Sequence, residues 1–214
     1  MEEKEFEHKY AHSDVSQISK EEIEEIMKHK GEVRGVVFQT DRRFIILKKG
    51  EEGLKKVEEE TKNLGYPIEY EKVNPLEWYP VGLRVISLIA IKRAFDWQDK
   101  DIFEMGNAAP KYSFVVKMLL KYFISLKRSV AEVPNYWRKH FTVGKISCPE
   151  FHEDEKWLII RLEGIKIHPI LCTHLAGYFL RIAQYVIRSP KIIIREEKCM
   201  FKGDPYHDFL FRWK

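Results

Sequence analysis

The sequence lacks the cysteines and long apolar runs that mark secreted and membrane proteins. It has three cysteines among 214 residues, so they cannot all pair, and no apolar segment resembles a secretory signal. The longest apolar stretch, Val85 to Ile91, is far shorter than the roughly 20 residues needed to cross a bilayer. We therefore expect a soluble protein of a reducing, cytoplasmic compartment.

Amide side chains and an excess of one charge are also lacking. Asparagine and glutamine together give eight residues, whereas lysine and glutamate are abundant, a composition typical of thermophilic proteins. Lys and Arg number 37 against 33 Asp and Glu, and a net charge of +4 is too balanced to indicate nucleic acid as a partner. We therefore expect a thermophile-like protein that does not bind nucleic acid.

Common catalytic motifs are absent too. The sequence has no phosphate-binding loop, no Gly-x-Gly-x-x-Gly, no His-Glu-x-x-His, no Gly-x-Ser-x-Gly and no Cys-x-x-Cys. Each of these motifs fixes a backbone turn or a ligand spacing that is hard to replace. Their absence argues against a common nucleotide enzyme or hydrolase and against a nicotinamide cofactor, and we expect no catalysis by this chain alone.

What is present predicts a folded globular protein. Hydrophobic residues make up 44% of the chain and aromatic residues 13%, enough for a sizeable core. A chain of 214 residues is within the range of one domain. We expect an N-terminal arm with a short helix over residues 1–30, followed by a single ligand-binding domain over residues 31–214.

Hydrophobic periodicity predicts the order of helices and strands. A capping-box sequence begins at Ser19 and predicts a short helix. The β-branched residues 33–39 predict a strand that continues into an extended piece over 43–47. Further helices are expected over residues 54–64, 80–95, 102–103 with their neighbours, 112–126, 129–137 and 170–187, and further strands over 141–146, 157–162, 191–198 and 207–213. This grouping predicts an α+β fold, a helical layer packed on a four- to five-stranded, mainly antiparallel sheet.

Three residues of the last third form a candidate metal site. Cys172 begins a predicted helix, Cys199 ends a predicted strand, and His207 begins the next strand after a short loop. Cysteine and histidine are the ligands that Zn²⁺ prefers, and a helix N-terminus favours the Cys172 thiolate. The alternative is that Cys172 is a small buried hydrophobe in the apolar stripe of its helix. We expect His174, two residues on, to be solvated or to cap the helix.

The sequence also predicts an apolar ligand cavity between the helices and the sheet, where such pockets commonly form. The candidate ligand contacts are Trp97, Phe114, Met118 and Tyr178. The alternative is that these side chains are ordinary core residues. His140, next to Trp137 and Arg138, is open to two interpretations: a group that binds an anion near a helix end, or part of a solvated face.

The C-terminal residues carry a family resemblance. They read His168-Pro-x-x-Cys172, Gly177-Tyr178, Arg195-Glu196-x-x-Cys199 and Lys202-Gly203-Asp204-Pro205-x-His207-x-Phe209. This quarter of the chain resembles vinyl-4-reductase-type domains, which share a ligand-binding fold with haem-nitric-oxide-binding proteins and TRAPP transport subunits. A myxobacterial family of unknown function is also similar. The vinyl-4-reductase family often has cysteine where this chain has His207, so one metal-competent side chain replaces another.

The resemblance implies helices over an antiparallel sheet with a small-molecule cavity between them. Haem-binding members of this fold use a Tyr-x-Ser-x-Arg element, and Tyr112-Ser113-Phe114 lacks its spacing and its arginine, so we expect no haem. The transport subunits carry an acylated cysteine before the sheet, and no cysteine precedes Cys148 here, so we expect no acyl chain of that kind. A reductase would need flavin or nicotinamide elements that the sequence lacks, so catalysis would rest on another subunit.

Three functions follow as hypotheses. The first is a non-enzymatic domain that binds or senses a small apolar molecule and works as a homodimer. The second is a metal-dependent role, with zinc held by Cys172, Cys199 and His207. The third is a scaffolding subunit that binds protein partners.

Overall fold

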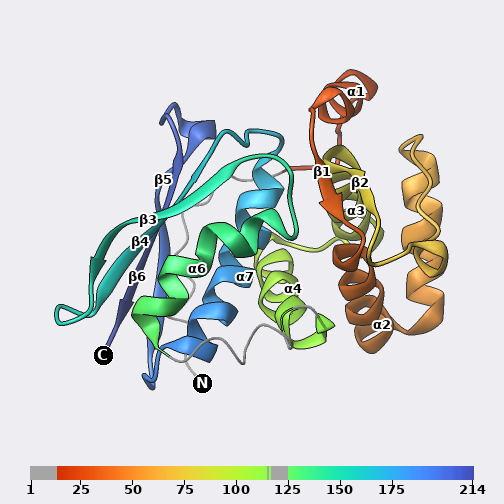
Figure 1. Cartoon of the computed structure of the whole chain (residues 1–214). Coiled ribbons are helices and arrows are strands. Elements are labelled where there is room, and N and C mark those ends of the chain that lie inside the picture. The colour runs from red at the N-terminus through yellow and green to blue at the C-terminus, as the bar shows by residue number, and fades with distance from the viewer. Residues whose placement is uncertain (1–13, 115, 117–124) are drawn as a thin grey trace.

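The computed structural model describes residues 14–114, 116 and 125–214. The helices of the first part are α1 (Lys20–Lys28), α2 (Val36–Asn63), α3 (Val81–Ala94), α4 (Asp99–Tyr112) and the short η2 (Tyr70–Lys72), and its strands are β1 (Glu32–Arg34) and β2 (Trp78–Pro80). The second part consists of α6 (Leu126–Arg138), β3 (Lys145–His152), β4 (Trp157–Glu163), α7 (Pro169–Val186), β5 (Ile192–Lys198), η3 (Met200–Lys202) and β6 (His207–Trp213). Figure 1 shows the sheet of β3 to β6 at one end, with α6 and α7 beside it, α4 next, and α3 and α2 at the other end.

The larger sheet has the strand order β3-β4-β6-β5 with every neighbouring pair antiparallel. Alternate residues of β4 are buried, and Leu158 and Ile160 lie opposite Phe211 and Phe209 of β6. One face of the sheet is therefore apolar, as period-two patterning requires. Phe179 of α7 meets Phe209 edge-on at 5.3 Å between ring centroids, so α7 covers this face. The predicted α+β fold, with helices on an antiparallel sheet, is confirmed.

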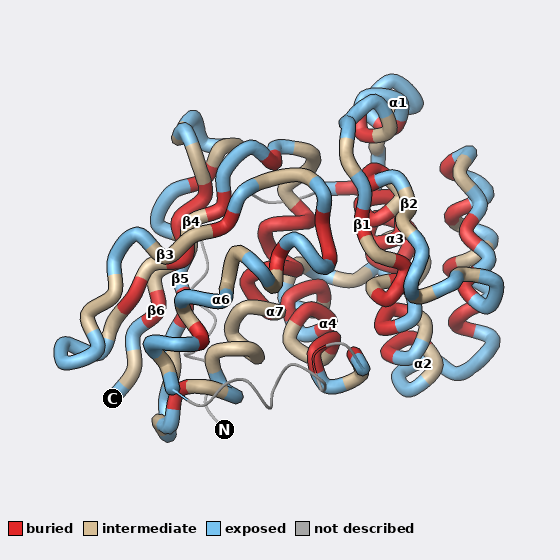
Figure 2. The backbone as a smooth tube through the Cα atoms, viewed as in Figure 1, coloured by how far each residue is buried: buried red, intermediate tan, exposed pale blue. Residues whose placement is uncertain are grey.

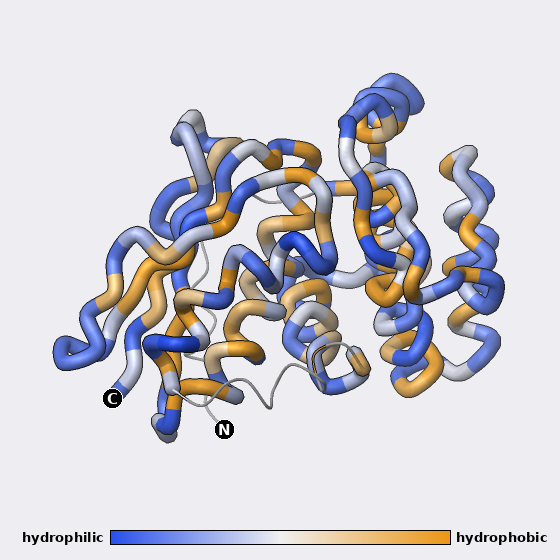
Figure 3. The backbone as a smooth tube through the Cα atoms, in the orientation of Figure 1, coloured by the Kyte–Doolittle hydropathy of each residue, from blue (hydrophilic) through white to orange (hydrophobic). Residues whose placement is uncertain are grey.

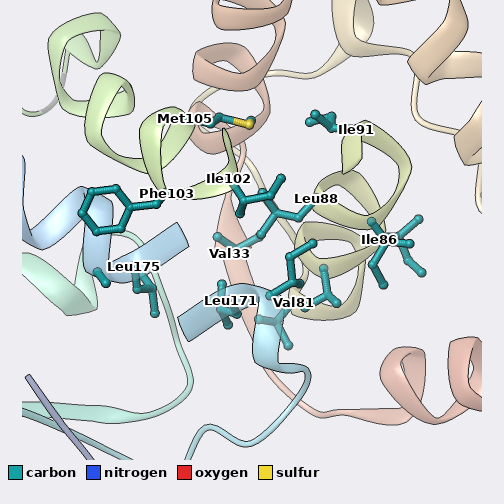
Figure 4. Close-up of a cluster of buried hydrophobic side chains, with 14 of the residues drawn as sticks. Val33, Val81, Ile86, Leu88, Ile91, Ile102, Phe103, Met105, Leu171 and Leu175 are labelled. Atoms are coloured by element: carbon teal, nitrogen blue, oxygen red, sulfur yellow. The ribbon is translucent and has the colours of Figure 1, made fainter. Parts of the chain in front are cut away.

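The helical core is centred on α3. Nearly all of its residues from Val81 to Lys92 are buried, and the buried, hydrophobic course of α3 is visible in Figures 2 and 3. Figure 4 shows part of the cluster, to which α3, α4 and α7 contribute Leu88, Ile102 and Leu171. A helix with apolar residues on all its faces is expected to be buried on all sides. This helix packs against α2 on one side and α7 on another.

Helices α4 and α7 approach each other at two glycines. A Cβ on Gly106 of α4 would lie 2.0 Å from the carbonyl oxygen of His174, and a Cβ on Gly177 of α7 would lie 2.0 Å from that of Phe103. Only a residue without a side chain permits this separation. The glycines therefore fix how close α7 lies to the helical core.

The structure corrects the prediction of extended chain over residues 33–39 and 43–47. Only Glu32–Arg34 forms a strand, and α2 begins at Val36 and runs through the remainder, with a kink at Gly50 where φ is 71°. Val36, Phe44 and Ile45 are buried on different sides of this helix. Their burial in the core overrides the β propensity of the Val, Ile and Phe residues.

Other predicted elements are confirmed with small shifts. The capping box is present, because Ser19 accepts from the backbone of Glu22 while the Glu22 side chain accepts from Ser19. Strand β3 begins at Lys145, and Phe141 instead forms an isolated bridge with Val33. The helix predicted over residues 112–126 falls largely outside the described residues. The division at residue 30 stays a prediction.

None of the helices formed by the described residues is both long and apolar enough to cross a bilayer.

Candidate functional site

An apolar cavity lies between α6, α7 and the inner face of the sheet. Its volume is about 140 Å³. An engineered apolar cavity of roughly 150 Å³ stays dry and binds benzene, so this space suits a molecule of one-ring size. Its apolar lining includes Val130, Val133, Trp137, Ile146, Leu158, Ile160, Leu171, Leu175, Tyr178, Phe179, Ile182, Ala183 and Phe211. The predicted cavity between helices and sheet is therefore present.

Two histidines interrupt this apolar lining, and the first is His140. It follows the end of α6 and is buried, and its Nδ1 lies 3.1 Å from the carbonyl oxygen of Tyr136. A carbonyl only accepts, so Nδ1 donates. Burial lowers the pKa of His140, which keeps the ring neutral and leaves a lone pair on Nε2. Neither interpretation of His140 from sequence, anion binding or a solvated face, matches this buried position.

His174 is the second histidine of the cavity, and its predicted position on a solvated or capping face is wrong. The side chain is buried, and its Nε2 lies 2.8 Å from Nη2 of Arg84 on α3. Arg84 is itself buried in an ion pair with Asp41 of α2, which also accepts from Ser87 at 2.8 Å. Burial and the Arg84 charge hold the pKa of His174 well below its usual range. The ring therefore links the cavity to a buried polar network between α2 and α3.

The residues predicted to contact a ligand are placed differently from one another. Tyr178 lines the cavity. Trp97 does not, and it packs edge-on against Phe44 of α2 with 5.9 Å between the ring centroids. Phe114 is 40% exposed and is not part of the lining. Met118 lies outside the described residues.

A second candidate site brings the predicted Cys172, Cys199 and His207 together with Glu196. One potential ligand atom from each of these four side chains lies within 4.8 Å of the others. Cys172 comes from the first turn of α7, Glu196 and Cys199 from the end of β5, and His207 from the start of β6. Two thiols, an imidazole and a carboxylate can complete the four-coordinate shell that is typical of zinc.

Hydrogen bonds hold His207 in position within this cluster. Its Nε2 lies 3.2 Å from the carbonyl oxygen of Ile165, so Nε2 donates and Nδ1 faces Oε1 of Glu196 at 3.0 Å. Such an outer contact to a backbone carbonyl orients metal-binding histidines. Burial opposes the charged ring, but bonds to Cys199 and Glu196 outweigh it and raise the pKa of His207 to about 9. A metal at Nδ1 would compete with this proton.

Sequence reasoning missed Glu196, Arg84 and Asp41. Glu196 stands three residues before Cys199, and the alternation of β5 puts it on the same face as Ile194, which is a signal that sequence reasoning could have used. Asp41 and Arg84 are 43 positions apart. Charged residues are usually exposed, so no local pattern predicts that these two meet in the interior.

No family model matches the sequence, and no curated protein matches it at a significant level. The structure is similar to an H-NOX protein from S. oneidensis in the Fe(II)NO ligation state, with a TM-score of 0.64 and 12% identity over 85% of this chain and 99% of that chain. It is also similar to an Fe(II) unliganded H-NOX protein from K. algicida, with a TM-score of 0.60 and 12% identity over 85% of this chain and 96% of that one.

These similarities overturn the argument against haem. A further similar structure, 13% identical with a TM-score of 0.58 over 85% of this chain and 95% of its own, comes from work on heme redox potential and porphyrin distortion. The missing Tyr-x-Ser-x-Arg element near Tyr112 therefore does not separate this chain from haem-binding relatives by fold, and the prediction against haem is wrong. The chain has the fold of the H-NOX proteins.

Proposed function

We propose that this chain is a sensory domain that binds a small, largely apolar molecule in the cavity between α6, α7 and the sheet. The observation that carries the proposal is the cavity itself, an apolar space of about 140 Å³ at the junction of helices and sheet. We further propose that the chain belongs with the vinyl-4-reductase-type domains, on its C-terminal motif. A homodimer and a cytoplasmic location stay predictions.

The cavity walls suggest how binding would be transmitted. Leu171 and Leu175 of α7 line the cavity and also belong to the helical core, whereas Val130 and Val133 come from α6. A ligand that contacts both helices favours whichever packing of α6 against α7 gives it more contact. A ligand shifts a conformational equilibrium only through such differential affinity.

Haem is a ligand that the donor chemistry admits. His140 lines the cavity and has a free lone pair on Nε2, the form of histidine that binds iron. Haem would supply an iron with a coordination position for a diatomic gas. The chain would contribute His140 as a ligand to the iron together with apolar walls, and α6 would have to move away from the sheet, because the cavity holds about one ring.

Benzene binding tests the proposed cavity. Titration of the protein followed by amide NMR should shift resonances of cavity-lining residues in α6, α7 and the sheet, with saturation at one benzene per chain. The variant Ala183→Phe places a ring in the cavity from α7 and should abolish binding. The control Gln184→Phe adds the same ring at the next, exposed position, so it should bind benzene normally. Shifts spread over the surface, or none at all, would contradict the proposal.

We also propose that Cys172, Glu196, Cys199 and His207 bind one divalent metal ion. The observation in favour is their convergence within 4.8 Å, with His207 already oriented by Ile165. The donor set suits zinc, although the structural similarities do not add support for it. Such an ion would cross-link α7 to the β5–β6 hairpin, because each of them supplies ligands.

Metal analysis of the purified protein tests this second proposal. We expect about one zinc per chain, loss of the metal in a Cys199→Ser, His207→Ala double variant, and a clear drop in melting temperature. The control Cys148→Ser removes the third cysteine, which lies on β3 outside the cluster, and should retain the metal. Metal-free protein whose stability is unchanged in the double variant would exclude the metal site.

A further inference from the structure

The proton on His174 is fixed by its neighbour. Arginine donates hydrogen bonds and cannot accept them, so the contact of 2.8 Å with Arg84 makes Nε2 of His174 the acceptor. A neutral ring with an accepting Nε2 carries its proton on Nδ1. Burial and the Arg84 charge keep the ring neutral. His174 therefore has an N–H donor at Nδ1.

This donor is buried without a partner among the residues that the structure describes. Nδ1 of His174 is inaccessible to solvent and makes no hydrogen bond there, and His174 is 4% exposed. The residue lines the cavity, whose walls are mostly apolar. Buried polar groups are nearly always hydrogen-bonded, so an unpaired donor on a ring that lines the cavity indicates a partner supplied by a ligand, for which the imidazole must shift slightly to turn Nδ1 toward the cavity.

The charges near His174 favour a neutral ligand over an anionic one. Arg84 is the one permanently cationic side chain among the described residues of the lining, and its charge is already balanced by the buried carboxylate of Asp41. A ligand carboxylate would lose its hydration on entering the cavity and would find no unpaired cation there to offset that cost. A neutral acceptor oxygen loses less on burial and gains the bond from Nδ1.

We propose, on the basis of the proposed cavity function, that the ligand is a neutral molecule of about one-ring size whose single acceptor oxygen, as in a ketone or aldehyde, binds Nδ1–H of His174. The rest of the molecule contacts aliphatic and aromatic walls such as Leu175 and Phe179. Size follows from the cavity volume of about 140 Å³. The position of the oxygen follows from the unpaired donor.

Two ligands that differ only in the group facing Nδ1–H of His174, here called the anchor, test this inference. Acetophenone and α-methylstyrene have the same shape, but a C=O group in the first is a C=CH₂ group in the second. In wild-type protein, imidazole NMR should show a proton on Nδ1 of His174 whose resonance moves with acetophenone and much less with α-methylstyrene. The variant His174→Phe should weaken acetophenone about 2- to 10-fold more than α-methylstyrene, the range of one hydrogen bond.

The outcomes separate the anchor from the cavity. The matched control His152→Phe changes a histidine on β3 outside the cavity and should alter neither affinity. Binding of both ligands with no response of the Nδ1 proton, or equal weakening by His174→Phe, would overturn the anchor and leave the cavity function intact. Failure of both ligands to bind would overturn the cavity function as well. The wild-type NMR measurement decides the question even if His174→Phe does not fold.

Discussion

Single residues set the local chemistry of this fold, and His168 is an example. It is the N-cap of α7, where its Nδ1 accepts a hydrogen bond of 3.2 Å from the backbone of Ile170. Burial is the main cause that lowers the pKa of His168, to about 4. The residue therefore stays neutral and keeps its cap under conditions where a free histidine is already protonated.

His168 should make the protein sensitive to mild acid. Because its pKa is lower in the folded state than the usual 6.5, the unfolded chain takes up the proton first. The stabilisation is complete above pH 6.5 and is lost as pH falls toward 4. The variant His168→Ser keeps a cap that does not titrate, so denaturant unfolding should show a pH dependence flatter by up to about 1.4 kcal/mol per pH unit. An unchanged slope would contradict this assignment.

Individual site residues were predictable only where the sequence gives a local signal. Cys172, Cys199 and His207 stand at ends of elements, so an approximate order of elements brings them together. His174 was misplaced because its surroundings come from Arg84, 90 positions away. No helix-periodicity argument contains a partner at that separation.

At the scale of elements, the contact between α4 and α7 depends on the two glycines described above. In Gly177→Ala the new methyl group would meet the Phe103 carbonyl at 2.0 Å, so the helices must separate. Overpacking of this kind costs about 1–3 kcal/mol or more, against roughly 1 kcal/mol gained in helix propensity. Denaturant unfolding should therefore show a net loss of stability.

The matched control for this contact is Glu104→Ala on α4, which replaces an exposed side chain and should change stability by less than about 0.5 kcal/mol. Gly177→Ala as stable as the unchanged protein would mean that α4 and α7 lie farther apart than described here.

Most elements follow from periodicity, and the exception has a physical reason. Strand β4 matches its prediction because one of its faces is buried on the core, and β6 and α7 match theirs in extent, although α7 is buried on all sides from Ile170 to Gly177. Residues 36–47 form part of α2 despite their β-branched composition. A run that is apolar on several sides fits either a buried strand or a buried helix, and the surrounding core decides between them.

For the whole molecule, the proposed ligand site lies at the junction between the helical layer and the sheet. The class and strand count of the fold were predictable from grouped helices and strands. The cavity was predictable only as a location, because its volume depends on how α6 and α7 pack on the sheet. The likeness to H-NOX proteins over 85% of the chain at 12% identity shows how far sequence can change within this fold.

Thermal unfolding with and without benzene tests this central claim most directly. A ligand that binds only the folded state stabilises it by about 2.7 kcal/mol at a concentration 100 times its Kd. The account predicts a benzene-dependent rise in melting temperature for the unchanged protein and for Gln184→Phe, and none for Ala183→Phe, whose cavity is filled. Equal shifts in all three proteins, or no shift in the unchanged protein, would contradict it.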